Sequence, residues 1–356
     1  LMMSGKMYRL RGVAPFMNNK YIMFFLLSHD AQRAIDEIKT GINDSGLNLT
    51  HDRFKQLEFS LPPSNLQTRI VAKIEHLFSE LDKGVENLKI AKSQLKAYRK
   101  SILKNAFEKR GSGDASIEEI FECLKAPYST HYNKILKKYK QSTDELKESG
   151  SFFSIPLSEL TEPNRSISYG VIKLGKEDPD GIPTLRSSNV RSLHMDENYI
   201  KKISPNISNK YARTILNGGE ILITIRGTLG GVCVVPKHFK GYNISREVAL
   251  ISPIKSIDPR YLQFYLASPT AENLFREKLR GVAYTGINLG SLKEIPILVT
   301  DTKKQIEIAD RLDGVFSLVV QQEKIIEESI SKVRALKDVI LKKAFAGELV
   351  PQDQTD

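Results

Sequence analysis

The chain has 356 residues, of which 40% are hydrophobic and 27% charged, with a formal net charge of +11. This length allows two or three domains with cores of their own, and the positive charge favours a polyanionic partner such as nucleic acid or an acidic membrane surface. No apolar run reaches the roughly 18–20 residues of a membrane span, and the first residues lack the apolar core of a signal peptide, so the sequence predicts a soluble cytoplasmic protein.

The front of the chain reappears about 240 positions later. Residues 21–28 (YIMFFLLS) match residues 261–268 (YLQFYLAS), and residues 101–107 (SILKNAF) match residues 339–345 (VILKKAF). A repeat of this length is too large for a solenoid unit, so one module of domain plus helix is predicted to occur twice. The first copy is incomplete: residues 1–60 correspond only to the tail of the domain that precedes the second helix.

Two long helices are predicted, over residues 61–110 and 301–349. Ser64 with Gln67, and Thr302 with Gln305, are interpreted as capping boxes in which the glutamine reaches back to the backbone N–H of the cap. A sustained seven-residue apolar repeat predicts a supercoiled seam, and two matched helices in one chain favour antiparallel pairing with each other. The alternative is that each heptad face packs on its own globular domain. The predicted seam consists of Ile74, Leu81, Leu88, Leu95, Ile102, Leu312, Val319, Ile326, Val333 and Ile340.

Between the helices, residues 111–150 are Lys-rich and predict a charged connector. Residues 151–300 alternate short β-rich runs with turns, which indicates a complete domain. Runs at 220–225 and 231–235 predict two strands, 261–279 predicts one amphipathic helix, and 295–299 predicts a strand that leads into the second long helix. Residues 350–356 are a tail. The predicted fold class is α+β: a mixed α/β domain plus two long antiparallel coiled-coil helices.

No catalytic constellation is present in the sequence. Residues 170–177 have the spacing of a phosphate-binding P-loop, but Glu177 occupies the position of the magnesium-binding Ser or Thr. The six histidines are scattered without metal-ligand spacing, and Cys123 and Cys233 are too far apart for a metal or redox motif. The sequence therefore predicts a protein without catalytic activity or a metal of its own.

Polar and basic residues in predicted loops of 151–300 are the candidates for a nucleic-acid interface. Arg can bind guanine through two hydrogen bonds in the major groove, Asn can bind adenine in the same way, and Ser suits phosphate oxygens. Any one of these residues taken alone is better explained as a solvated or turn-capping side chain, whereas the set together favours an interface. The candidates are Arg186, Ser187, Ser188, Asn189, Arg191, Arg226, Thr228, Arg246, Tyr284 and Asn288.

Several stretches together resemble the specificity subunit of Type I restriction–modification enzymes. They are residues 182–189 (IPTLRSSN), 211–222 (YARTILNGGEIL), 226–230 (RGTLG), 286–289 (GINL) and 340–349 (ILKKAFAGEL). Similar proteins carry two target-recognition domains, each reading one half of a bipartite DNA site. Two spacer helices set the gap between the half-sites and dock methyltransferase subunits. Glu220 departs from the family pattern, in which Asp is usual.

The resemblance implies a non-enzymatic subunit that binds double-stranded DNA. Its partners would be the methyltransferase subunits and, in the full complex, the restriction subunit. S-adenosylmethionine, ATP and magnesium are expected on those partners and not on this chain. Within this family, residues 151–300 would be a complete recognition domain.

Residues 1–60 would be the remnant of a first recognition domain truncated at the N-terminus, with the apolar stretch 21–27 left uncovered. A separate polypeptide could supply the missing part, or two copies of the chain could pair. Alternatively, the chain is an inactive or recombination-donor copy. A reading from another class is a coiled-coil scaffold whose β-rich domain binds protein.

Overall fold

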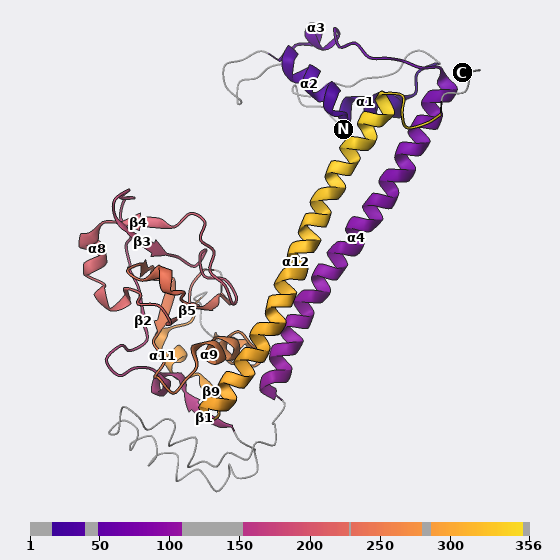
Figure 1. Cartoon of the computed structure of the whole chain (residues 1–356). Helices are drawn as coiled ribbons and strands as arrows, with labels where there is room; N and C mark the ends of the chain where they lie inside the picture. Colours follow the sequence, from indigo (N-terminus) through magenta and orange to yellow (C-terminus); the bar gives the residue numbers. More distant parts are fainter. Residues whose placement is uncertain (1–15, 40–48, 109–151, 228, 280–285, 352–356) are drawn as a thin grey trace. The chain divides into compact units, whose positions relative to one another are not determined.

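The computed structural model describes residues 16–39, 49–108, 152–227, 229–279 and 286–351 (Figure 1). The predicted connector 111–150, Thr228 and Tyr284 lie outside the described residues. The chain divides into two compact units, Leu1–Leu95 with Val320–Asp356, and Lys96–Val319. Helices α4 (Ser64–Glu108) and α12 (Thr302–Phe345) each contribute residues to both units, so the units do not follow the boundaries predicted for the helices.

The first unit begins with a helical hairpin of α1 (Asn19–Leu27) and α2 (His29–Ile38), followed by the short α3 (His51–Phe54). Ser28 forms the corner of the hairpin. Its backbone N–H donates to the carbonyl of Phe25, and its Oγ accepts from the backbone N–H of Ala31. A serine that ends one helix and caps the next fixes the angle between them.

The hairpin packs on the long helices through one side of α1. The ring of Phe345 lies 5.3 Å from that of Tyr21, centroid to centroid. Tyr21 and Phe24 are buried, whereas Met23 and Leu27 remain 45% and 55% exposed, so the expectation that the whole stretch 21–27 is uncovered holds for one side only. The core of this unit consists of Tyr21, Phe24, Leu66, Ile70, Val71, Ile74, Leu341 and Ala344.

Within the first unit, α4 and α12 run antiparallel, as predicted. The Lys337 Nζ lies 2.6 Å from Asp82 Oδ1, and the Lys92 Nζ lies 2.6 Å from Glu327 Oε1. Residue numbers therefore fall along α12 as they rise along α4. The Lys337 ammonium also lies 4.9 Å from the centroid of the Phe78 ring, which adds a cation–π contact across the pair.

The described residues of the second unit form three sheets. Strand β1 (Phe153–Pro156) pairs antiparallel with β9 (Pro296–Val299). A four-stranded antiparallel sheet has the order β2-β8-β5-β6, from β2 (Ser168–Tyr169), β8 (Val248–Ile251), β5 (Ile221–Thr224) and β6 (Val232–Val234). A three-stranded sheet has the order β4-β3-β7, from β4 (Lys201–Ile203), β3 (Ile182–Leu185) and β7 (Asn243–Ile244). The β3–β7 pair is parallel and the β3–β4 pair antiparallel.

The four-stranded sheet separates two hydrophobic clusters. Ile221, Ile223 and Ala249 face the larger cluster, and Leu222 and Leu250 face the smaller one. Successive side chains of a strand point to opposite faces, so a sheet that is covered on both faces needs an unbroken apolar run. This explains why residues 220–225 show no alternation of polar and apolar residues. The strands predicted at 220–225 and 231–235 are present as β5 and β6.

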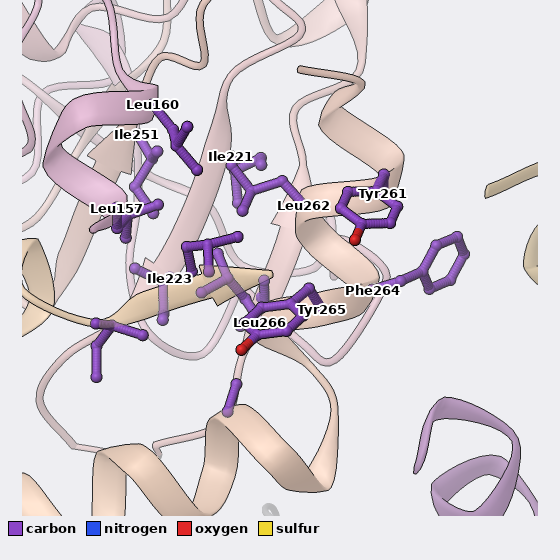
Figure 2. Packing of buried hydrophobic residues seen from close by; sticks show 14 of the residues in the cluster. Leu157, Leu160, Ile221, Ile223, Ile251, Tyr261, Leu262, Phe264, Tyr265 and Leu266 are labelled. Carbon is purple, nitrogen blue, oxygen red and sulfur yellow. The ribbon is translucent and has the colours of Figure 1, made fainter. Parts of the chain in front are cut away.

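The predicted helix over 261–279 is two helices, α9 (Pro259–Leu266) and α10 (Pro269–Leu279). The break lies at Ser268, whose Oγ accepts from the backbone N–H of Ala271, and at Pro269, which has no N–H to continue a helix. Figure 2 shows α9 packed into the larger cluster. The Tyr261 and Tyr265 hydroxyls donate to the carbonyls of Leu298 and Pro296, which ties α9 to β9.

The described part of the second unit also contains short helices. They are α8 (Pro205–Asn209), α11 (Leu289–Lys293) and 3-10 turns at Leu157–Leu160, Ala212–Thr214 and Lys237–Phe239.

The predicted capping boxes are wrong. The Gln67 side chain does not bind the start of its own helix but joins the segment before α1 to the segment before α4. Its Oε1 accepts from the backbone N–H of Asn18 at 2.9 Å, and its Nε2 donates to the carbonyls of Phe16 and Pro62. Gln67 is only 1% exposed, so these bonds lie inside the first unit.

Candidate nucleic-acid interface

Three loops of the second unit meet at one edge of its sheets. They are 186–188 after β3, 226–227 after β5, and 245–247 between β7 and β8. Strands β3 and β7 are parallel, with Leu185 opposite Ile244. The segments that follow these two strands therefore leave the sheet on the same side. Strands β5 and β8 are antiparallel with Thr224 opposite Val248, so the end of β5 adjoins the start of β8. Strand topology therefore gathers segments that are far apart in sequence.

Glu247 holds these loops together. Its Oε2 accepts from the Ser187 Oγ at 2.8 Å and from the Ser187 backbone N–H at 3.3 Å. Its backbone carbonyl accepts from the N–H groups of Ile225 and Arg226. At Gly227, with a φ of +74°, a Cβ would lie 3.2 Å from the Ser187 Oγ, so a side chain there would be strained and crowded.

Each of the three loops carries one arginine. Arg226 and Arg246 are exposed and Arg186 is half-buried. None of the three guanidinium groups forms an ion pair with a residue that the structure describes, and the buried Nε of Arg186 has no hydrogen-bond partner there. A guanidinium group carries five N–H donors in a planar fork that matches guanine and phosphate acceptors. The edge therefore presents three guanidinium groups that form no ion pair with a described carboxylate, while the Glu247 carboxylate at the same edge binds Ser187.

Asn189 has an internal role. It is 1% exposed, its Oδ1 accepts from the backbone N–H of Arg186, and its Nδ2 donates to the carbonyls of Asp196 and Asn198 at 3.0 Å each. Both ends of the amide are therefore bonded within the loop, and its burial leaves no edge accessible to adenine. Asn189 instead shapes the loop that carries Arg186.

Arg191 follows the loop that carries Arg186 and Asn189, and its Nη2 lies 3.3 Å from Asp196 Oδ2. Hydrogen bonds from the backbone and side chain of Asn198, and then from Arg191, hold the pKa of Asp196 below its ordinary value. The carboxylate is thereby kept charged and paired. Arg191 remains 42% exposed at its side chain, so it can still contact a ligand.

The remaining candidates divide between exposed and structural positions. Ser188 is exposed, and Ser187 is bound to Glu247. Asn288 is the N-cap of α11, where its Oδ1 accepts from the backbone N–H of Ser291 at 2.8 Å. Thr228 and Tyr284 lie outside the described residues, so the structure assigns them no place.

Sequence reasoning missed Glu247. A carboxylate in a basic loop has no motif that marks it, because its role depends on a serine 60 positions earlier. Glu220, the departure from the family pattern, is also structural. It is 4% exposed, pairs with Arg165 at 2.6 Å, and accepts from the backbone N–H groups of Asn217 and Gly218.

The ten positions of the predicted helix seam are buried or half-buried in the structure. Ile74, Leu312, Val319 and Ile326 are buried. The other six are half-buried: Leu81, Leu88, Leu95, Ile102, Val333 and Ile340.

Neither a metal cluster nor a membrane span is found among the residues that the structure describes. No group of three or more His, Cys, Asp or Glu side chains there could hold a metal ion. In the same ranges, no helix is long and apolar enough to cross a membrane. Burial raises the pKa of the Cys233 thiol to about 12, so this cysteine stays protonated and unreactive at neutral pH.

Comparison with known proteins identifies the family. Residues 155–332 match the model of the Type I restriction modification DNA specificity domain. The chain is 27% identical over 314 residues to the Type I restriction enzyme EcoBI specificity subunit of Escherichia coli, covering 87% of this chain and 63% of that protein. It is 25% identical over 337 residues to the EcoKI specificity subunit of Escherichia coli strain K12, covering 93% of this chain and 66% of that protein.

A solved structure shares the fold. A chain from a structure described as the basis of complex assembly and conformational transition of the type I R-M system aligns with a TM-score of 0.63 and 18% identity. The alignment covers 94% of this chain and 72% of the other. The present chain thus spans about two thirds of the length of its relatives. With the family model matching over 155–332, this protein belongs to the Type I restriction–modification DNA specificity family.

Proposed function

We propose that the second unit recognises one half-site of a bipartite DNA target. The observation that carries this proposal is the edge at which Glu247 holds together the loops that carry Arg186, Arg226 and Arg246. Side chains from three loops can follow the edges of neighbouring bases, whereas a single loop reaches fewer. Family membership and the net charge of +11 support the same partner.

The paired helices are proposed to dock methyltransferase subunits and to set the gap between two half-sites. The long helices α4 and α12 also carry large apolar side chains that remain exposed to solvent. Leu318 is 63% exposed and Val320 is 56% exposed. Exposed apolar side chains on paired helices are typical of surfaces that bind protein. In this proposal the chain is not an enzyme. S-adenosylmethionine, ATP and magnesium would be bound by the methyltransferase and restriction subunits.

A second recognition domain is proposed to cover α1. The counterpart of α1 is α9, in which Leu262 and Leu266 are buried and contact the rest of its unit. The corresponding Ile22 and Leu26 are only half-buried, and Met23 is exposed. This difference leaves on α1 an apolar side that a second recognition domain would bury.

The proposal is tested by co-expressing the chain with its cognate methyltransferase subunit and mapping methylated adenines across the host DNA. A bipartite methylated motif is expected, and Arg226→Ala should change or abolish it. A palindromic motif would indicate that two copies of the same recognition domain assemble. A stable complex with no methylation would support the inactive copy, and failure to form a complex would refute the proposed partner.

A coiled-coil scaffold that binds only protein is the competing function. Salt separates the two, because a protein that neutralises several DNA phosphates loses affinity steeply as ionic strength rises. Binding of a duplex should therefore weaken between low and physiological salt. A scaffold held by apolar contacts would show no such dependence and no duplex binding.

A further inference from the structure

The second unit contains a cavity that the three-loop edge does not use. It has a volume of about 660 Å³ and lies between the last turns of α4, helix α10, the segment 190–193 and the turn that joins β5 to β6. Its inner wall is apolar and includes Leu103, Val232 and Phe275, which are buried members of the larger hydrophobic cluster. The cavity is therefore walled by fixed elements.

The rim of the cavity is strongly basic. Among the described residues that line it, five are basic and Glu272 is the one acidic residue. The Glu272 carboxylate accepts from Arg276 at 2.6 Å and from Lys100 at 3.2 Å. Burial alone would raise the pKa of Glu272, but these two hydrogen bonds outweigh it and leave the pKa below its ordinary value. The basic residues are Lys96, Arg99, Lys100, Arg191 and Arg276.

These cations remain accessible. The side chains of Lys100 and Arg276 are 57% and 69% exposed in spite of their contact with Glu272, and Lys96 is exposed as well. Two carboxylates, Glu272 and the Asp196 that pairs with Arg191, face five basic residues, so the rim has an excess of positive charge. Cations drawn from α4, α10 and the segment 190–193 surround one opening, which suits a ligand with several negative groups.

The backbone around the opening is held in a fixed shape. Leu193 has a φ of 67°, which L-residues rarely adopt, and its N–H donates to the carbonyl of Val232 at 2.7 Å. At Gly231, a Cβ would lie 2.2 Å from the carbonyl oxygen of Val190. This close approach presses the turn between β5 and β6 against the segment 190–193. Rare backbone conformations of this kind concentrate at ligand-binding sites.

The cavity is continuous with the three-loop edge through one turn. Arg226 begins the turn after β5, and Gly230 and Gly231, at its other end, line the cavity. A duplex whose bases meet Arg226 would carry its sugar–phosphate backbone past the same turn. This continuity and the excess of positive charge favour DNA over an acidic protein segment as the occupant.

We propose that this basic rim binds the sugar–phosphate backbone of DNA beside the half-site. The inference rests on the proposed function, because it assigns a phosphate-contacting surface to the second unit, which is proposed to recognise DNA. Lys96 and Lys100 lie four positions apart, on one face of the last turns of α4. They would contact phosphates as point charges and so contribute affinity without sequence preference.

The test uses the full chain with a fluorescent duplex that contains the mapped motif, and a scrambled duplex of equal length. The binding constant of each is measured over a range of salt concentrations. Each phosphate contact contributes about 0.9 to the slope of log K against log salt. K96Q/K100Q should therefore lower the slope by roughly 1 to 2, while the ratio of affinities for the two duplexes changes less than about twofold.

Two control variants test whether the change in slope depends on positive charge at these two positions. Lys303→Gln removes an exposed lysine of α12 that does not line the cavity, and should leave the slope nearly unchanged. K96R/K100R keeps the charge and should restore the slope of the original chain. Thermal unfolding of each variant checks that the fold remains intact.

The outcomes are distinct. If the unaltered chain binds with a steep slope and K96Q/K100Q retains it, the phosphate surface is refuted while the proposed function stands. If the double variant keeps its slope but loses the methyltransferase subunit, the cavity docks protein and the inference is overturned. If the unaltered chain binds neither duplex at low salt, the proposed function itself fails.

Discussion

Gln67 and Gln305 make the same three hydrogen bonds in the two halves of the chain. Gln305 accepts from the backbone N–H of Asp258, the N-cap of α9, and donates to the carbonyls of Ser256 and Thr300. Gln67 does the same with Asn18, the N-cap of α1, and with Phe16 and Pro62. The repeat therefore preserves a buried polar junction between a helical hairpin and a long helix.

We expect Gln305→Ala to destabilise the protein by about 2–4 kcal/mol, because it leaves a buried N–H and two buried carbonyls without partners. Urea unfolding followed by circular dichroism measures the change. Lys303→Ala, at an exposed position on the same helix turn, is the matched control and should have an effect below about 0.5 kcal/mol. An equal decrease in the free energy of unfolding for the two variants would show that the hydrogen bonds of Gln305 do not stabilise the protein.

Arg186 and Asn189 lie in one short loop but should behave differently. Arg186→Ala should change or abolish the methylated motif while the chain keeps its unfolding temperature. Asn189→Ala should cost roughly 2 kcal/mol, since it breaks three hydrogen bonds of a buried amide. Ser188→Ala, at an exposed position, is the control for stability. If Arg186→Ala left the methylated motif unchanged, Arg186 would not be a residue that contacts the bases of the half-site.

Glu247→Ala should relax specificity, because the Ser187 hydroxyl and N–H lose their acceptor and the loop of Arg186 is no longer held against that of Arg226. The affinity for scrambled duplex should stay within about threefold, since removing a carboxylate removes no phosphate contact. Methylation mapping should then show degenerate positions in one half-site. A motif as sharp as the original would show that Glu247 does not position these loops.

The helix pair should depend on its apolar seam. Leu88→Ala combined with Ile326→Ala should destabilise the first unit by about 3–5 kcal/mol, since one half-buried and one buried aliphatic side chain are removed. Ile325→Ala is the matched control, because Ile325 is 46% exposed beside the buried Ile326. Thermal unfolding measures both. A larger loss at Ile325 would place the contact on the other face of α12.

Stability should also depend on pH through the Lys92–Glu327 pair. A hydrogen bond from Lys92, together with its charge, holds the pKa of Glu327 below its ordinary value of 4.5. A carboxyl group whose pKa is lower in the folded state stabilises the fold above its unfolded pKa, and this contribution is lost as the pH falls through the folded pKa.

Glu327→Gln should therefore lose a little stability at neutral pH and show a shallower decline in unfolding temperature below about pH 4.5. Glu328→Gln is the control, because the Glu328 carboxylate lies 3.9 Å from Lys324 on the same helix and makes no pair with the described residues of α4. Identical pH profiles for the original chain and Glu327→Gln would contradict the prediction.

The sequence alone determined the architecture. Heptad spacing, the offset repeat and unbroken apolar runs predicted two long antiparallel helices and an α+β domain, because these patterns record which faces must be buried. Two predictions made from local sequence patterns were wrong. Apolar periodicity predicted one helix over 261–279, but Ser268 and Pro269 divide it into two. Gln67 and Gln305 have the spacing of capping boxes, yet each accepts a hydrogen bond from a backbone group far away in the sequence.

Only the tertiary structure decided which polar residues are available to a ligand. Asn189 and Arg186 share one short segment, yet burial occupies the amide of the first and leaves the guanidinium of the second without an ion pair among the described residues. The grouping of Arg226 and Arg246 with Glu247 depends on strand order, and the basic rim depends on Lys96 and Lys100 lying against α10. Hydrogen bonds and charges between residues far apart in the chain follow from strand pairing and helix packing, which no local pattern encodes.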